Sequence, residues 1–267
     1  MPLLTLTNIH KTFEKGTINE NPVLRGLDLE IEQGDFISVI GGNGAGKSTL
    51  MNSIAGVVEI DEGDILLDGQ SIRKSSVADR SKSISRVFQD PRMGTATNLT
   101  IEENMAIAYR RGKKRSFFKR SITEEERQIF KGALEHLGLG LENRMKTDAN
   151  FLSGGQRQAL TLSMATLVRP KILLLDEHTA ALDPKTSDMV MNLTKKVVEE
   201  QQLTTLMVTH NMEHAIEYGN RLIMLFHGKI VVDVKGKEKE NLTVAQLMDL
   251  FHKNSGQVLN DDALVLG

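Results

Sequence analysis

The sequence predicts an α/β fold organised around a sheet of parallel, buried strands. Two short apolar runs carry this prediction, at residues 36–40 and 172–176, and a further strand is expected over 203–209. A continuous apolar run is typical of a strand that is covered on both faces, as parallel strands are. The first run continues through a glycine-rich loop into helix-like sequence at 50–55, which is the strand–loop–helix order of an α/β unit.

The glycine-rich loop has the spacing of a phosphate-binding loop. Residues 41–49 read Gly-Gly-Asn-Gly-Ala-Gly-Lys-Ser-Thr. Glycines allow backbone N–H groups to curl around a phosphate, and the following helix adds the positive end of its dipole. We expect Lys47 to reach the β- and γ-phosphates and the Ser48 hydroxyl to bind Mg²⁺. The alternative is an ordinary glycine-rich connection, but the context favours a site for a nucleoside triphosphate.

Composition narrows the class of protein. The 267 residues are 40% hydrophobic and 25% charged, with a formal net charge of −2, so no general attraction to nucleic acid is expected. The absence of cysteine excludes disulfides, zinc–thiolate sites and thiol catalysis. We expect no signal peptide at residues 1–7, and no apolar stretch approaches the roughly 18 residues of a membrane span. Any membrane role is therefore expected to be peripheral.

The N-terminal part predicts an antiparallel pair of strands. Residues 4–9 and 24–31 alternate apolar and polar side chains, as half-buried strands do. Phe13 follows the first of these strands, where its ring could stack on an adenine with Val23 packed beside it. A plain packing role for Phe13 is the alternative. Residues 65–69 predict a further strand and turn, and the polar stretch that follows has no clear pattern.

The middle of the chain predicts another strand and two helices. Residues 85–89 read as a strand that ends in Gln89, whose amide could accept a hydrogen bond from Mg²⁺-bound water. A capped helix is expected from Thr100, and a second over 123–137. The basic run 110–120 between them has two interpretations. It is a solvated surface loop, or it contacts anionic lipid headgroups or a membrane partner.

A second glycine-rich turn occupies residues 152–156, with the sequence Leu-Ser-Gly-Gly-Gln at the start of a predicted helix. Ser153 and the amides of Gly154 and Gly155 could hold another face of a phosphate. The alternative is the N-terminus of a core helix that happens to contain glycine.

Two buried strands end in residues that suit phosphate chemistry. Asp176 closes the run 172–176 and is expected to bind Mg²⁺ through water. Glu177 follows it, where a carboxylate could orient or deprotonate the attacking water. His210 follows the run 203–209 and is a candidate γ-phosphate contact, with a structural role as the alternative.

The C-terminal part predicts a hairpin and a helix. Strands are expected at 221–226 and 229–234, joined through His227 and Gly228. An amphipathic helix is expected over 241–253, followed by a tail.

Taken in order, these motifs resemble the ATP-binding subunit of an ATP-binding-cassette (ABC) transporter. The motifs are the glycine-rich loop, Phe-Gln89, Leu-Ser-Gly-Gly-Gln156, Ile172–Glu177, Ala180–Asp183 and Val208–His210. The resemblance implies an α/β fold with a RecA-like P-loop NTPase core, an antiparallel β subdomain and an inserted α-helical subdomain. The core and β subdomain would comprise 1–97 and 170–240, the helical subdomain 98–169, and a C-terminal helix and tail 241–267.

The resemblance also implies ATP and Mg²⁺ as ligands and ATP hydrolysis as the activity. The residues that it places on the nucleotide are Phe13, Val23, Gly42, Asn43, Gly44, Ala45, Gly46, Lys47, Ser48, Thr49, Ser153, Gly154, Gly155 and Gln156. The metal would be held by Ser48, Gln89 and Asp176. The catalytic residues would be Glu177 as general base and His210 as switch histidine, with Lys47 and Gln89.

In this family the Leu-Ser-Gly-Gly-Gln motif of one subunit faces the P-loop of another, so a second copy of the chain is an implied partner. Asp183 would lie in the loop that crosses this dimer interface. Transmembrane permease subunits are the other direct partners, at the cytoplasmic face of the membrane. An exporter, a lipoprotein-extracting complex and a soluble scaffold ATPase are alternatives to an importer.

One residue departs from the family pattern. His178 stands where most relatives have proline after the glutamate. Together with residues 180–185 and 110–115, it is similar to a small bacterial branch. That branch pairs with a substrate-binding lipoprotein for the uptake of tryptophan or other aromatic amino acids.

Overall fold

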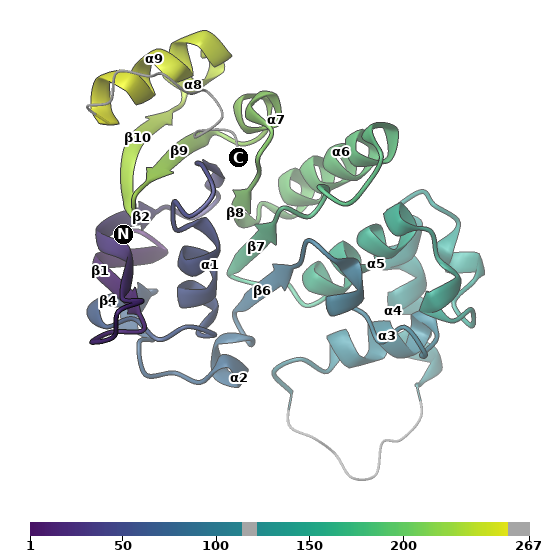
Figure 1. The fold of residues 1–267 in the computed structure, drawn as a ribbon. Coiled ribbons are helices and arrows are strands. Elements are labelled where there is room, and N and C mark those ends of the chain that lie inside the picture. The colour runs from purple at the N-terminus through teal and green to yellow at the C-terminus, as the bar shows by residue number, and fades with distance from the viewer. Residues whose placement is uncertain (114–121, 256–267) are drawn as a thin grey trace. The chain divides into compact units, whose positions relative to one another are not determined.

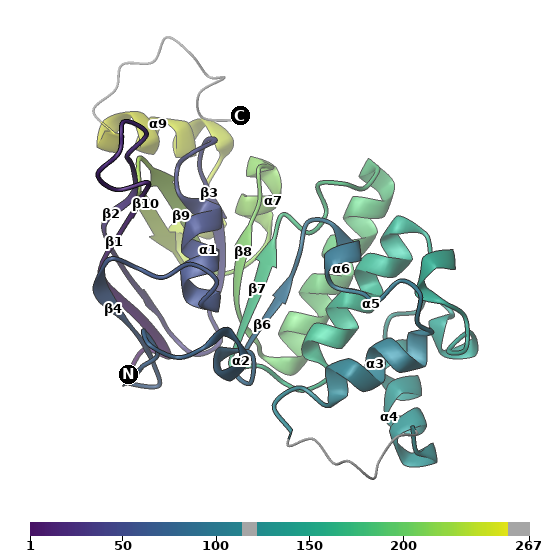
Figure 2. The same ribbon diagram turned by 60° about the horizontal axis from the view of Figure 1, so that its bottom comes forward.

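The computed structural model describes residues 1–113 and 122–255. These residues form two compact units, one from residues 1–80 together with the chain from 203 onward, and the other from 81–202 (Figures 1 and 2). The sheet strands and helices of both units bear out the predicted α/β class.

The first unit contains an antiparallel sheet in the order β2-β1-β4-β5. Its strands are β1 (Leu4–Phe13), β2 (Asn21–Ile31), β4 (Glu62–Leu67) and β5 (Gln70–Ser71). This sheet explains why apolar and polar side chains alternate near the N-terminus, because the apolar residues Leu4, Leu6 and Ile9 of β1 are buried. The predicted antiparallel pairing of the first two strands is confirmed.

The first unit also contains the strand that leads to the glycine-rich loop, together with three further strands. Their order is β10-β9-β3-β8, and the bounds are β3 (Phe36–Ile40), β8 (Thr204–Val208), β9 (Arg221–Phe226) and β10 (Lys229–Lys235). Strand β3 is parallel to both neighbours, and β9 and β10 form the predicted antiparallel hairpin. Every residue of β3 and of β8 is buried, which explains why both strands are mostly apolar; the exceptions are Ser38, Thr204 and Thr205.

Five helices complete the first unit among the described residues. They are α1 (Lys47–Ala55), α2 (Val77–Arg80), α7 (Met212–Glu217), α8 (Lys237–Glu240) and α9 (Val244–Ser255). The prediction of one helix from residue 241 was wrong about its start. Thr243 accepts a hydrogen bond from the Gln246 N–H, and the Gln246 side chain accepts one from the Thr243 N–H. This capping box begins α9 at Val244 and separates it from α8.

The second unit combines two parallel strands with four helices in its described part (Figure 2). The strands are β6 (Ile84–Val87) and β7 (Ile172–Asp176), and the helices are α3 (Ile101–Tyr109), α4 (Glu124–Glu135), α5 (Gly154–Thr166) and α6 (Pro184–Gln201). Short 3-10 turns occupy Pro91–Met93, Leu141–Asn143 and Ala149–Phe151. The apolar residues of β7 are fully buried, so the central-strand prediction for 172–176 is confirmed.

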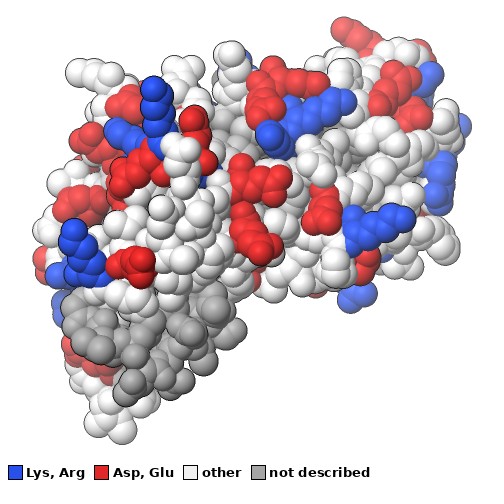
Figure 3. All heavy atoms as spheres, turned by 90° about the horizontal axis from the view of Figure 1, so that it is seen from above, with Lys and Arg blue, Asp and Glu red and all other residues white. Residues whose placement is uncertain are grey.

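Charge is mixed on one face of the molecule. Acidic and basic side chains are interspersed on the face seen in Figure 3, which agrees with the small formal net charge of −2. Within the described ranges, no helix is long and apolar enough to pass through a membrane.

Candidate nucleotide-binding and hydrolysis site

The glycine-rich loop joins β3 to α1 in a path that only glycine can follow at two points. A Cβ on Gly41 would lie 2.3 Å from the carbonyl oxygen of Leu225. Gly46 has a φ of +106°, and a Cβ there would lie 3.0 Å from the Leu24 side chain. The backbone therefore passes close to its neighbours and enters the helix in a conformation that other residues rarely adopt.

The start of α1 is suited to an anion. Within the described chain, no side chain caps this helix at Gly46, so its N-terminal N–H groups are available to a ligand. Lys47 is 6% exposed, and its ammonium donates hydrogen bonds to the carbonyls of Gly41 at 2.6 Å and Gly42 at 3.2 Å. A fixed ammonium beside uncapped amides fits the charge of a triphosphate.

The loop is braced by the hairpin at the end of β9. The Gly228 N–H donates to the Ala45 carbonyl at 3.1 Å, and the Gly228 carbonyl accepts from the Arg25 N–H at 3.1 Å. The hairpin thus connects the loop to β2. Val23, also on β2, has its carbonyl 3.2 Å from the Cβ position of Gly46. The predicted neighbour of the nucleotide base therefore packs directly against the loop.

Phe13 is the last residue of β1, which extends beyond the expected strand 4–9, so Phe13 ends the strand and does not follow it. The residue is 38% exposed, so it is accessible to a ligand. The Lys11 ammonium lies 5.5 Å from the ring centroid and also forms an ion pair with Asp61 at 3.0 Å. Hydrogen bonds from the Thr12 N–H and Lys11 help to lower the pKa of Asp61 against the opposing effect of burial.

His210 lies at the same edge of the sheet as the glycine-rich loop. Strand β8 is parallel to β3, with Val208 opposite Val39, and the Thr209 N–H donates to the Val39 carbonyl at 3.1 Å. The carboxyl ends of both strands therefore coincide, which is where ligands bind in open α/β sheets.

The second unit brings the other strand-end residues together. Strands β6 and β7 are parallel with Val87 opposite Leu175, so Gln89 and the Asp176–Glu177 pair lie at the carboxyl ends of neighbouring strands. The expectation that the strand ends in Gln89 was wrong, because β6 ends at Val87. Carboxylate and amide oxygens at such an edge suit Mg²⁺. The Asp176 carboxylate forms an ion pair with the Arg86 guanidinium, so its charge is balanced by a cation here. Glu177 has a φ of +47°, in the left-handed region.

The Leu-Ser-Gly-Gly-Gln motif begins α5. Ser153 and Gln156 form a reciprocal capping box, with contacts of 3.2 and 3.3 Å. Gly155 is required by close packing, because a Cβ there would lie 2.3 Å from a methyl carbon of Thr186 on α6. Asp183 caps α6 through the Thr186 N–H, and hydrogen bonds from Thr186 lower the pKa of Asp183.

The described part of the basic run has structural roles. The Arg111 guanidinium donates to the carbonyls of Ala165 and Val168 at 3.1 and 2.5 Å, and burial lowers its pKa. Arg110 forms an ion pair with Glu126 at 3.7 Å. Arg110 is exposed, as expected for a solvated surface loop, whereas Arg111 is held by its carbonyl partners and fits neither interpretation. Residues 114–120 of the run lie outside the described residues.

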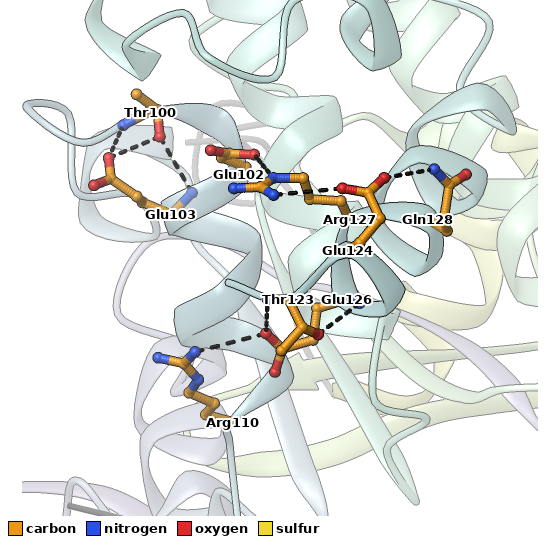
Figure 4. Close-up of polar contacts among 9 residues, drawn as sticks. All are labelled: Thr100, Glu102, Glu103, Arg110, Thr123, Glu124, Glu126, Arg127 and Gln128. Atoms are coloured by element: carbon orange, nitrogen blue, oxygen red, sulfur yellow. Dashed lines mark hydrogen bonds and ion pairs between the residues drawn. The ribbon is translucent and has the colours of Figure 1, made fainter. Parts of the chain in front are cut away.

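Helices α3 and α4 carry an ordered polar network beside this run (Figure 4). Arg127 donates to Glu102 at 3.0 Å and to Glu124 at 3.4 Å, and the hydrogen bond with Glu102 raises the pKa of Arg127. Capping boxes begin both helices, as predicted, at Thr100 and Thr123.

The candidate residues thus fall into two sets. The first unit holds the glycine-rich loop, Phe13, Val23 and His210, and the second holds Gln89, Asp176, Glu177 and the residues of 153–156. Sequence reasoning missed Arg86 and Gln158. Arg86 stood within a recognised strand, but its partner depends on the alignment of β6 with β7, which no local pattern shows.

Similarity to known proteins shows the family to which this chain belongs. The protein-family model described as ABC transporter matches residues 24–180 of the sequence. The chain belongs to this family. The tyrosine transport ATP-binding protein of Clostridioides difficile (strain R20291) is 46% identical over 249 residues, which cover 93% of this chain and 98% of the relative. The phosphonates import ATP-binding protein PhnC of Lactobacillus gasseri (strain ATCC 33323) is 33% identical, with 98% of both chains covered.

Solved structures agree with this assignment. A dimeric post-hydrolysis state of the ATP-binding cassette MJ0796 with ADP and Pi has a TM-score of 0.73 and 30% identity, covering 87% of this chain and 98% of that one. The ADP conformation of the cassette MJ1267 has a TM-score of 0.75 and 28% identity, covering 94% and 98%. The protein is therefore an ATP-binding subunit of an ABC transporter, an ATPase with the RecA-like P-loop fold.

Proposed function

We propose that this chain hydrolyses Mg²⁺-ATP as a head-to-tail dimer and powers the import of an aromatic amino acid such as tyrosine. The observation that carries the substrate class is the 46% identity to the tyrosine transport protein across 98% of its length. The PhnC relatives, whose name specifies phosphonate import, have 33% identity, so an amino acid is the better supported substrate.

In this proposal the first unit holds the nucleotide. Lys47 and the amides at the start of α1 bind the β- and γ-phosphates, and Phe13 stacks on the adenine with Val23 beside it. His210 contacts the γ-phosphate. The uncapped helix terminus and the buried Lys47 ammonium support these assignments, because both favour an anion that has lost much of its water.

The second unit contributes the hydrolytic groups. Gln89 and Asp176, with Ser48, hold Mg²⁺ directly or through water, and Glu177 accepts a proton from the attacking water. When bound, Mg²⁺ would neutralise charge on the phosphate oxygens. The Arg86–Asp176 ion pair supports a cation site, since it shows a carboxylate that is balanced by a positive charge.

The remaining phosphate contacts come from a second copy of the chain. Ser153, Gly154, Gly155 and Gln156 form the first turn of α5, where N–H groups and the helix dipole favour an anion. We propose transmembrane permease subunits and a substrate-binding lipoprotein as the other partners, with the chain peripheral at the cytoplasmic face. Contact of the basic run 110–120 with lipid or permease remains a prediction.

Substrate uptake tests this proposal. Cells whose only copy of the gene carries Lys47→Ala should lose most transport of labelled tyrosine supplied at limiting concentration. Lys195→Ala, which removes an exposed lysine from α6, is the matched control and should transport normally. Uptake of labelled methylphosphonate and lysine should be unaffected. Normal tyrosine uptake with Lys47→Ala, or a selective loss of methylphosphonate uptake, would refute tyrosine as the substrate.

A further inference from the structure

His178 is a buried polar residue directly after the proposed general base. Its side chain is 2% exposed, and the residue before it, Glu177, has a left-handed backbone with a φ of +47°. A residue other than glycine keeps this conformation only where the surrounding structure holds it. The contacts on either side of the Glu177–His178 peptide are therefore candidates for that support.

The His178 ring is anchored to α6. Its Nε2 atom lies 3.0 Å from the hydroxyl oxygen of Thr194, and the same hydroxyl lies 2.8 Å from the carbonyl oxygen of Val190. A hydroxyl has one hydrogen, and a carbonyl can only accept. Both contacts are hydrogen bonds only if Thr194 donates to Val190 while His178 donates from Nε2. The geometry therefore places a proton on Nε2.

The same peptide is held on its other side by a turn. The carbonyl of Glu177 accepts a hydrogen bond from the Ala180 N–H at 2.9 Å. Thr194 is 0% exposed, so water does not compete for the bond between His178 and α6. A change in the direction of Glu177 would thus require the loss of a buried hydrogen bond, of the turn, or of both.

We propose that His178 is a positioning residue for Glu177, because it fixes the backbone of the base to α6 through a hydrogen bond from Nε2 to Thr194. This inference rests on the proposed role of Glu177. A general base must lie within hydrogen-bond reach of the proton that it removes, and a misplacement of about 1 Å can cost roughly 100-fold in rate. Loss of the anchor should therefore lower kcat and leave ATP binding intact.

Steady-state ATP hydrolysis by the full chain tests this role, with ATP affinity measured by calorimetry. His178→Met keeps side-chain length but removes the donor, and we expect kcat to fall about 10- to 100-fold while Kd for ATP changes less than about twofold. His178→Gln retains an N–H donor near the position of Nε2 and should recover most of kcat. Thr194→Val removes the acceptor with little change in volume. Thr194→Val should lower kcat by a similar factor. The double variant His178→Met/Thr194→Val should have a kcat only slightly below that of either single variant.

Glu177→Gln in the same assay separates failure of this inference from failure of its premise. If Glu177→Gln is inactive while His178→Met and Thr194→Val turn over at the parental rate, His178 does not position the base. Equal losses in His178→Met and His178→Gln, or a loss of ATP affinity, would also overturn the inference and indicate plain packing. A fully active Glu177→Gln would instead refute the role of Glu177. If His178→Met does not fold, Thr194→Val decides the question.

Discussion

Gln158 of α5 donates a hydrogen bond from Nε2 to the backbone carbonyl of Phe88 across 3.1 Å. This bond links the helix that begins with Leu-Ser-Gly-Gly-Gln to the residue before Gln89. Gln158 is 0% exposed, and its Oε1 atom has no hydrogen-bond partner among residues 1–113 and 122–255. The buried amide thus holds the segment after β6 through one donor, at the cost of an unsatisfied acceptor.

Replacement of this amide should loosen the segment around Gln89. Gln158→Met removes the hydrogen bond, worth about 1 kcal/mol, but it also removes the unsatisfied Oε1, so we expect little net change in the free energy of unfolding. Backbone amides of residues 88–93 should exchange at least several-fold faster in hydrogen–deuterium exchange mass spectrometry. Unchanged exchange in that segment would show that the hydrogen bond does not hold it.

Arg86 should compete with Mg²⁺ for Asp176, because both cations need the same carboxylate. Arg86→Met is therefore expected to lower the Mg²⁺ concentration for half-maximal ATP hydrolysis by a few-fold. Arg169→Met removes an exposed arginine from the same unit and is the matched control, with no expected change. A higher Mg²⁺ requirement in Arg86→Met would mean that Arg86 instead prepares Asp176 for the metal.

Lys239 provides a test of the C-terminal packing. Its ammonium is 2% exposed and donates to the carbonyls of Ile216, Tyr218 and Gly219 at 2.7–2.8 Å. Burial lowers the pKa of Lys239 to about 8, from an ordinary value of 10.5. The carbonyls favour the ammonium, since only that form has three hydrogens to donate.

The sign of the pH effect follows from this pKa. Between pH 8 and 10.5 the unfolded chain binds one more proton at Lys239 than the folded chain, so the contribution of Lys239 to the free energy of unfolding rises with pH. Urea unfolding at pH 7.5 to 10.5 gives the free energy of unfolding of the parent and of Lys239→Met, and the difference between the two reports the contribution of Lys239. The difference between the two should shift in favour of the parent by up to about 3 kcal/mol. A flat difference would contradict the lowered pKa.

Local patterns in the sequence were sufficient to predict the main strands and the glycine-rich loop between a strand and a helix. The runs 36–40 and 172–176 have the observed strand bounds, because a strand that is covered on both faces is mostly apolar. The helix over 123–137 was correct at its start, where Thr123 and Glu126 form the capping box, although it ends at Glu135.

The contacts between residues distant in the sequence could not be predicted from such local patterns. Arg86 meets Asp176 because β6 and β7 align Val87 with Leu175, and Gln158 reaches Phe88 because of how α5 packs. His178 was noticed as a departure from the family, but its bond to Thr194 depends on the path of the chain into α6. Each contact is set by tertiary packing and not by local sequence.

The most direct test of the central claim is the mass of Glu177→Gln in solution, measured by size-exclusion chromatography with light scattering in Mg²⁺-ATP. The amide retains size and removes one negative charge, so ATP should still bind while hydrolysis falls by about 10²- to 10⁴-fold. Because Ser153–Gln156 of a second copy would complete the site, we predict a shift from monomer to dimer. A second substitution in the same chain, Ser153→Arg, should reverse that shift. A Glu177→Gln protein that remains monomeric with ATP bound, or hydrolyses ATP at the parental rate, would contradict the account.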